Sequence, residues 1–449
     1  MPAGCALGDA LSRLHEMGAD ALIVTREGHA IGILTLSDLP GRVLLPRVSP
    51  DASVDDVMTR DVPALDADVD ADNAAAEMAR RRVSHALVRE RNGTLLGVVS
   101  RKDLSACPPP LRRIAQAPDA EALERVARAV REHGISMLRG GVSAEVLMRH
   151  MAALNDALAA RAIELVLASH DDATALDGVR WCWLAFGSEG RMEQTFSTDQ
   201  DNGLVFQPPD GVAPGAVRPA LLRVAEAINR LLERLGFPLC DGGIMAGQPR
   251  CCLSLDEWRS GFANWMSTPQ PEALLAASIF FDVRALHGDA GLADELRAHI
   301  SRRAQGSPLF LRLMATNAVA VRPPLDMLRR FRVDDVPGAP RSLDLKAGAR
   351  IFIDCARALA LRDGAVAGST RERLRGIAGE GTHCAIKAFH FIQQLRLARQ
   401  ADAPVPPSRA VANRIDPATL DDLDRVMLRQ AFMQARHLQN RVRLDWQLR

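Results

Sequence analysis

The sequence predicts an α/β protein of several domains: an α+β pair of repeats, then a mixed sheet flanked by helices, then a helical bundle. Three observations predict this class. A short segment recurs 65 residues later, two apolar strand-length segments flank a glycine turn and an aspartate pair, and three long amphipathic segments end the chain. We expect domains at 1–106, 176–335 and 336–449, with a helical bridge at 107–175.

Composition excludes several classes of protein. The 449 residues carry 56 Lys and Arg against 55 Asp and Glu, a formal net charge of +1, so no overall field draws the chain to nucleic acid or to an anionic membrane. No segment is long and apolar enough to predict a membrane span. The 8 cysteines show no paired spacing and are expected to be free thiols, which indicates a cytoplasmic protein.

The repeat is the clearest internal signal. Residues 32–38 read GILTLSD, and residues 97–103 read GVVSRKD. An amphipathic helical segment, at 9–17 and 74–82, and an apolar strand, at 21–24 and 86–88, precede the two copies, so each unit is predicted to be helix, strand, turn, strand and a new helix. The first unit begins so near Met1 that its initial strand is expected to be missing.

These two units resemble a tandem CBS pair over about residues 1–106. The resemblance implies an adenine nucleotide (AMP, ADP or ATP) as a regulatory ligand, and a homodimer, because such pairs commonly associate. The ligand residues that it implies are Thr35, Asp38, Ser100 and Asp103, since a hydroxyl and a carboxylate at a helix start can bind ribose. The same residue types are also the usual helix N-caps, and that interpretation stays open.

The chemistry-bearing segment begins with an apolar strand at 181–186 that ends in Gly187, Ser188, Glu189 and Gly190. Backbone N–H groups around Gly187, Ser188 and Gly190 could approach phosphates closely, because glycine has no Cβ. A Gly-Ser turn is also a common helix cap, so the turn alone is weak evidence.

A second strand follows Asp199 and Asp201. Residues two apart in an extended segment share a face, so both carboxylates should lie together beside the glycine turn. Two neighbouring carboxylates repel unless a cation lies between them, and hard oxygen ligands suit Mg²⁺ or Mn²⁺. Asp-x-Asp also occurs in many loops, so the pair alone is weak evidence.

In combination, segments 184–191 and 198–202 resemble the nucleotidyltransferase superfamily that includes DNA polymerase β, and within it the branch of the bacterial PII-protein uridylyltransferase. The likeness covers roughly residues 120–300. It implies transfer of a nucleoside monophosphate from a nucleoside triphosphate to an acceptor, here a regulatory protein, with release of pyrophosphate. RNA is the less favoured acceptor, because the chain has no long basic tract.

The resemblance also assigns roles. Asp199 and Asp201 would hold the metal, and a third carboxylate is expected from Asp241, with Asp282 in reserve. The nucleotide phosphates would contact Gly187, Ser188, Gly190 and Arg191. A scaffold of this kind can also lose turnover, so a catalytically silent nucleotide-binding module is the alternative function.

The remaining segments are predicted to be structural. Trp258 and Trp265 lie seven apart on a predicted helix and should pack in a core, while the segment with Arg371, Arg373 and Arg375 is expected to be solvated. Helices are predicted at 345–361, 383–400 and 420–443, and they resemble a substrate-binding-like bundle in which Lys346 or a nearby arginine contacts phosphate.

Overall fold

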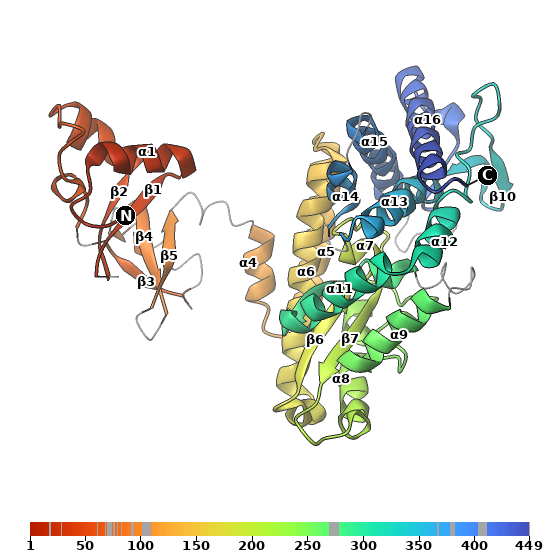
Figure 1. Ribbon diagram of the computed structural model, residues 1–449, viewed down its shortest axis with the longest axis horizontal. Helices are drawn as coiled ribbons and strands as arrows, with labels where there is room; N and C mark the ends of the chain where they lie inside the picture. The colour runs from red at the N-terminus through yellow and green to blue at the C-terminus, as the bar shows by residue number, and fades with distance from the viewer. Residues whose placement is uncertain are drawn as a thin grey trace. The chain divides into compact units, whose positions relative to one another are not determined.

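The computed structural model describes residues 1–449 except 18, 28, 61, 68, 70–73, 75–76, 79, 82, 91–93, 101–108, 269–277, 366–367, 378–381, 403–410 and 449. The chain divides into two compact units, Met1–Arg112 and Arg113–Arg449 (Figure 1). The predicted α/β multidomain class is confirmed, with mixed sheets and a C-terminal helical region. Among the described residues, no helix combines the length and apolar character that crossing a membrane requires.

The first unit contains two similar antiparallel hairpins. In each hairpin the second strand ends in a hydroxyl residue that pairs with the first residue of the first strand. Ala21 pairs with Thr35 in the first hairpin, and His85 pairs with Ser100 in the second. A third strand runs parallel to the second hairpin, whereas the first hairpin makes two isolated bridges, a parallel one between Pro2 and Thr25 and an antiparallel one between Ile33 and Thr59. The elements are α1 (Leu7–Met17), β1 (Ala21–Arg26), β2 (His29–Thr35), η1 (Leu36–Asp38), η2 (Pro40–Leu44), η3 (Val54–Asp56), β3 (Ala64–Asp66), β4 (His85–Arg89) and β5 (Leu95–Ser100).

The second unit is organised on a four-stranded sheet in the order β8-β7-β6-β9. Its strands are β6 (Arg180–Ala185), β7 (Asn202–Gln207), β8 (Cys252–Ser254) and β9 (Arg284–Gly288). β6 pairs antiparallel with β7 and with β9, while β7 pairs parallel with β8, so the sheet is mixed. Because Ala185 faces Asn202 in this register, the turn after β6 lies beside the segment that precedes β7.

Helices surround this sheet because its central strands are buried on both faces. The helices of this part of the second unit are α5 (Ala120–Arg139), α6 (Ala144–Ser169), η4 (Asp171–Leu176), α7 (Gly187–Gly190), α8 (Pro214–Arg234), α9 (Leu255–Ser267), η5 (Ser278–Phe281), α11 (Ala290–Gln305) and α12 (Pro308–Ala318). Helix α4 (Pro109–Ala115) spans the division between the two units. Helices α9 and α11 pack against the face that bears Cys182, Leu184 and Val205. Trp258 is confirmed as a core residue: it contacts Phe186 and donates from Nε1 to the Leu204 carbonyl at 3.1 Å.

The C-terminal region is helical, as predicted, with α13 (Leu345–Arg362), α14 (Thr370–Gly376), α15 (Thr382–Ala401), η6 (Pro417–Thr419) and α16 (Asp422–Asp445). Helix α13 is its centre, because it contacts α12, α14, α15 and α16 (Figure 1). The sequence does not predict the small sheet that accompanies these helices, made of β10 (Asp334–Val336), β11 (Ala339–Asp344) and β12 (Arg414–Ile415). Its strands are two to six residues long, too short to show an alternating pattern.

Buried charge joins the sheet to these helices. Asp282 is 1% exposed and accepts from Arg191 Nη1 at 2.5 Å, from Arg357 Nη2 at 2.6 Å and from Arg373 Nη1 at 2.5 Å. Burial alone would raise the pKa of Asp282, but the three guanidinium groups hold it well below its ordinary value. Arg357 lies on α13 and Arg373 on α14, so one carboxylate ties two C-terminal helices to the start of β9.

Two expectations are wrong at this cluster. Arg373 is 5% exposed and ion-paired instead of solvated, because its partner Asp282 lies 91 residues away in sequence and gives no local signal. Asp282 itself, the reserve third carboxylate, is enclosed by guanidinium groups that occupy both of its oxygens. We assign it a structural role.

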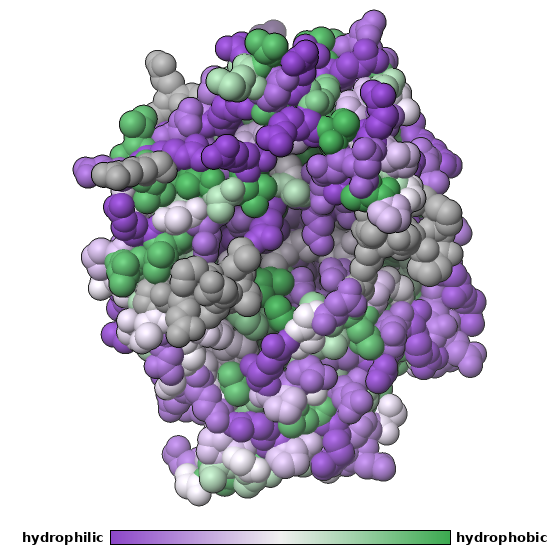
Figure 2. Space-filling view, turned by 90° about the vertical axis from the view of Figure 1, so that its right-hand side faces the viewer, coloured by the Kyte–Doolittle hydropathy of each residue, from purple (hydrophilic) through white to green (hydrophobic). Residues whose placement is uncertain are grey.

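The surface shown in Figure 2 is mainly hydrophilic. Outside the grey atoms, hydrophobic side chains form small groups on this face and do not make a broad continuous area.

Replacing Asp282 with Asn tests the buried ion cluster. Asn keeps the shape but leaves an excess buried positive charge, so we expect the free energy of unfolding to fall by about 3–5 kcal/mol. Urea unfolding followed by tryptophan fluorescence measures it, since all 5 tryptophans lie in the second unit. The control Asp289→Asn breaks a half-exposed pair with Arg180 and should cost less than about 1 kcal/mol. Equal effects of the two substitutions would contradict the proposed importance of Asp282.

Candidate functional site

A cavity of about 330 Å³ lies where β6 ends and β7 begins, between the sheet and helices α13 and α15. It brings together the predicted turn, the predicted aspartates and basic residues of the C-terminal helices. The residues that line it and carry the argument below are Gly187, Ser188, Arg191, Glu193, Asp199, Asp201, Lys346, Arg350, Asp354, Arg357, Gln393 and Arg396.

Gly187 is required by local geometry. Its φ is +54°, in the left-handed region, and an added Cβ would lie 2.9 Å from Ile279 and 3.1 Å from Asp201 Oδ2. The Phe186 N–H donates to the Asp201 carbonyl at 2.8 Å. Absence of a Cβ at residue 187 therefore lets the Asp201 carboxylate approach the turn directly.

Gly190 has a different role. An added Cβ would lie 1.8 Å from the Asp282 carbonyl oxygen and 2.9 Å from that of Ala185, so glycine permits close packing of main chains. Gly190 lines a neighbouring cavity and is not among the described residues around the larger one, which contains Gly187 and Ser188.

The aspartates alternate with two anchoring amides. Gln200 is 2% exposed and donates to the carbonyls of Asn229 and Phe237, while Asn202 is 1% exposed and accepts from Asn229 Nδ2 at 2.9 Å. With these two side chains in the interior, Asp199 and Asp201 both reach the cavity. The segment precedes β7 yet keeps the two-residue alternation of an extended chain.

Electrostatics at the pair favour a bound cation. Burial, together with the nearby Asp199 charge, raises the pKa of the Asp201 carboxyl to about 7. A hydrogen bond from the Cys240 thiol and the positive charge of Lys346 act in the opposite direction. Two hard carboxylate ligands that repel each other in a half-buried cavity form a donor set that suits Mg²⁺ with water and phosphate completing its shell.

Helix α13 carries a basic face into the cavity. Lys346, Arg350 and Arg357 are spaced by four and seven residues, which places them on one side of a helix. Within the described residues Lys346 makes no ion pair or hydrogen bond, whereas Arg350 pairs with Asp354 at 3.0 Å. The sequence predicts a phosphate role for Lys346 or a nearby arginine, and the structure places Lys346 in the cavity.

Arg396 on α15 was missed by the sequence reasoning. It is 7% exposed and donates to the neutral oxygens of Gln393 at 2.6 Å and Asn413 at 3.1 Å, with no carboxylate partner in the part of the chain that the structure describes. Burial lowers the pKa of Arg396 to about 10. It lies on a helix with little amphipathic character, so no sequence pattern distinguished it from the other arginines.

Arg191 reaches the cavity wall, but its charge is already compensated. Its Nε donates to Glu193 at 2.8 Å, and its Nη1 donates to Asp282. Glu193 in turn accepts from the Thr370 N–H at 2.5 Å on α14. The geometry supports Arg191 as a structural part of the wall more directly than as a free phosphate ligand.

Asp241 lies on an exposed turn before β8 and is not among the described residues that line the cavity. Over the described residues, no group of three or more His, Cys, Asp or Glu side chains has an arrangement suited to a metal ion. The structure thus brings Asp199 and Asp201 together without Asp241.

In the first unit, Thr35 ends β2 and is 5% exposed. Its Oγ1 donates to Asp38 Oδ2 at 2.7 Å, and its N–H donates to the same oxygen at 3.0 Å, which is a capping arrangement. Ser100 is also buried, at the end of β5. Asp103 lies outside the described residues.

Three segments match known families. Residues 54–107 match a model described as "CBS domain", residues 128–272 match "Putative nucleotidyltransferase DUF294", and residues 308–446 match "Putative nucleotidyltransferase substrate binding domain". The chain therefore combines a CBS domain with two segments of nucleotidyltransferase type. The glycine turn and aspartates fall in the second match, and Lys346 and Arg396 in the third.

Solved structures of CBS domain proteins resemble about a quarter of the chain. A CBS-domain containing protein from Agrobacterium tumefaciens is 28% identical, covers 23% of this chain and 84% of its own, and gives a TM-score of 0.21. A CBS domain protein from Pyrobaculum aerophilum complexed with AMP is 19% identical over 24% of this chain and 83% of its own, with a TM-score of 0.23. No curated protein matches the chain.

Gly187→Ala tests the close approach of the turn to Asp201. The left-handed backbone and the contact with Ile279 should lower the free energy of unfolding by about 1–2 kcal/mol. Urea unfolding measures the change. Gly261→Ala in α9 is the control, because no atom lies within 4 Å of its added Cβ and alanine should stabilise the helix by about 0.5–1 kcal/mol. A neutral Gly187→Ala substitution would show that the described geometry is not needed.

Proposed function

We propose that the second unit is a metal-dependent nucleotidyltransferase, which transfers a nucleoside monophosphate from a nucleoside triphosphate to an acceptor. One observation carries the proposal: a single cavity contains the Gly187 and Ser188 turn, the Asp199 and Asp201 pair and the α13 basic face. The first two elements belong to one family match and the third to the other, which supports a site made from both segments.

Asp199 and Asp201 are the proposed ligands of Mg²⁺ or Mn²⁺. The raised pKa of Asp201 fits this role, because a cation between the carboxylates would relieve their repulsion. A bound divalent ion would stabilise charge on the departing pyrophosphate and lower the pKa of the attacking hydroxyl. Gln200 and Asn202 hold the backbone that carries both aspartates, so they are proposed as positioning residues.

Lys346, Arg350 and Arg396 are proposed to bind the triphosphate. Lys346 is exposed in the cavity, while Arg396 is buried there with only neutral partners among the described residues. A buried guanidinium whose hydrogen-bond partners are neutral gains from direct pairing with an anion, and phosphate oxygens supply such a partner. In the reaction an acceptor oxygen forms a bond to the α-phosphorus, the bond to the bridging oxygen breaks, pyrophosphate leaves, and the acceptor loses its proton.

The proposed acceptor is a regulatory protein, as in the uridylyltransferase branch that segments 184–191 and 198–202 resemble. The near-zero net charge supports a protein over RNA. We also propose that the first unit, as a homodimer, regulates transfer by binding AMP, ADP or ATP. The CBS match and the equivalent places of Thr35 and Ser100 at strand ends support that role.

The second candidate function is a nucleotide-binding regulatory module without turnover. The position of Asp241 on an exposed turn favours it, because this chemistry usually employs a third carboxylate. Pyrophosphate release separates the two functions, since binding alone produces none.

Replacing both Asp199 and Asp201 with Asn tests the metal site. We expect pyrophosphate release from a nucleoside triphosphate and Mg²⁺ to fall by at least about 100-fold, because charge stabilisation by the ion is lost. Calorimetric titration of each nucleotide with Mg²⁺ measures binding in parallel. Asp210→Asn, at an exposed turn, is the control. Unchanged release in the double variant would reject the transferase proposal, and binding that needs both aspartates without any release would support the silent module.

Lys346→Met tests the basic face of α13. Loss of one charged contact to phosphate should weaken nucleotide binding by about tenfold, and the difference should shrink at high salt. The chain offers a matched control in Lys387→Met, since Lys387 is exposed on α15 and is absent from the described lining of the cavity. If both variants bind nucleotide equally well, α13 does not contact the phosphates.

A further inference from the structure

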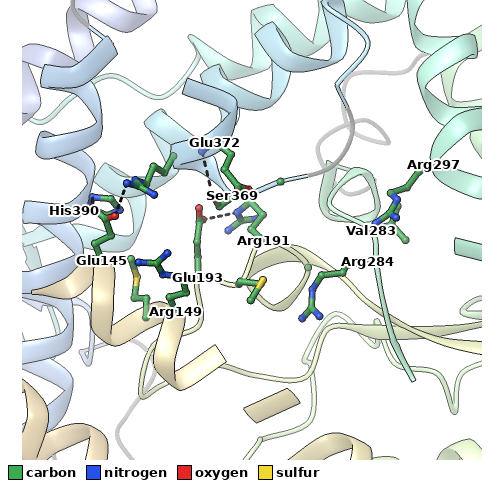
Figure 3. A pocket seen from close by; sticks show the side chains of 15 residues that line it. Glu145, Arg149, Arg191, Glu193, Val283, Arg284, Arg297, Ser369, Glu372 and His390 are labelled. Atoms are coloured by element: carbon green, nitrogen blue, oxygen red, sulfur yellow. Dashed lines mark hydrogen bonds and ion pairs between the residues drawn. The ribbon is translucent and has the colours of Figure 1, made fainter. Parts of the chain in front are cut away.

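A second cavity, of about 130 Å³, is lined by the turn that follows α7 (Figure 3). Residues of α6, β9, α11, α14 and α15 surround it. Arg191 and Glu193 line both cavities, so the segment from Arg191 to Glu193 is a wall shared with the proposed nucleotide site. Nothing in the proposed transfer reaction uses this second space.

Arginines outnumber glutamates in its lining. Five arginines and three glutamates line it: Arg149, Arg191, Arg284, Arg297 and Arg371, with Glu145, Glu193 and Glu372. Four of the arginines have carboxylate partners, which are Asp282 for Arg191, Asp156 for Arg284, Asp294 for Arg297 and Glu145 for Arg371. Arg149, exposed on α6, makes no hydrogen bond or ion pair with any residue that the structure describes.

The donors of this cavity exceed its acceptors. The Nε–H groups of Arg284 and Arg371 are buried and have no acceptor among the described atoms. Buried donors without partners are costly, and they are rare unless water or a ligand satisfies them. Arg149, Arg284 and Arg371 each contribute a guanidinium group to the lining of this cavity.

The shared wall is also conformationally unusual. Met192 has a φ of +58°, in a region that a side chain with a Cβ disfavours, and it is 36% exposed. Such backbone conformations are concentrated at functional sites. Since Arg149 and Met192 are both exposed, the cavity reaches solvent at their edge.

We propose that this cavity binds a small oxyanion, bearing a phosphate or carboxylate group, and that its occupancy alters nucleotide binding through the shared wall. Its volume suits a compact anion and not a nucleotide, since an engineered cavity of about 150 Å³ holds one benzene molecule. Arg149, Arg284 and Arg371 donate to the oxygens of the anion. Glu193 also accepts hydrogen bonds from the N–H and hydroxyl of Thr370, so in this proposal it links the occupancy of the anion cavity to α14 and to the nucleotide cavity.

Calorimetric titration of the full chain with inorganic phosphate, and separately with succinate, tests the anion site in the absence of nucleotide. We expect one of these anions to bind, and Arg149→Gln to weaken that binding by about tenfold. Arg128→Gln, an exposed arginine on α5 that does not line the cavity, should bind as the unmodified protein does. The anion that binds tells phosphate and carboxylate ligands apart.

Lys346→Gln distinguishes this cavity from the nucleotide site. Retained anion binding in Lys346→Gln with loss in Arg149→Gln supports the proposal. The reverse pattern would place the anion at the nucleotide site and overturn it, as would absence of binding up to about 10 mM of either anion. Arg371→Gln, monitored by tryptophan fluorescence for correct folding, should also weaken binding.

The coupling rests on the proposed function and is measured separately. Nucleotide and Mg²⁺ are titrated with and without the saturating anion, and we expect the affinity to change by at least about fivefold in the unmodified protein and by less in Arg149→Gln. An unchanged nucleotide affinity would overturn the coupling. If no nucleotide binds at all, the proposed function fails while the phosphate and succinate titrations still decide the anion site.

Discussion

The carboxylate of Asp282 is the constraint on which the second unit depends. It is a fully buried charge, and an isolated ion in such a place would be too costly to keep. Three guanidinium groups, from the turn after α7, from α13 and from α14, offset that cost by donating hydrogen bonds to the carboxylate. Because Glu193 and Asp354 compensate the remaining positive charge, the whole cluster is close to neutral. Its geometry is therefore satisfied only when the sheet and the C-terminal helices are packed together.

This cluster also determines where the candidate site lies. Arg191 and Arg357 are members of the cluster and also wall residues of the nucleotide cavity. Their pairing orients α13, and that orientation presents Lys346 and Arg350 to the aspartate pair across the cavity. Such a site needs carboxylates to bind a metal and cationic side chains to bind phosphates, and these two sets of side chains tend to pair with each other. Here Asp282 and Asp354 occupy the inner arginines, while Lys346 has no such partner among the described residues.

One short segment, from Gly187 to Glu193, contributes residues to the walls of both cavities. Gly187 opens the turn toward Asp201, Gly190 lets the main chain pack against Asp282, and Met192 accepts an unfavourable φ. Glu193 then leaves the turn to hold the N–H and hydroxyl of Thr370. In the coupling proposed above, this segment, held by the buried polar contacts of Arg191 and Glu193, would carry a displacement from one cavity to the other.

The sequence by itself determined the local features of this protein. The strand at β6, the glycine turn, the aspartate pair and the helices α13, α15 and α16 follow from patterns a few residues long, because backbone preference and periodicity act over such distances. Only the tertiary structure decided that Asp282 is a structural ion, that Arg373 is buried and that Asp241 lies on an exposed turn outside the described lining of the cavity. The partners of Asp282 lie 75 and 91 residues away, and Arg396 reaches the cavity from another helix. Pairing between charges so distant in sequence depends on how helices pack, which no local pattern encodes.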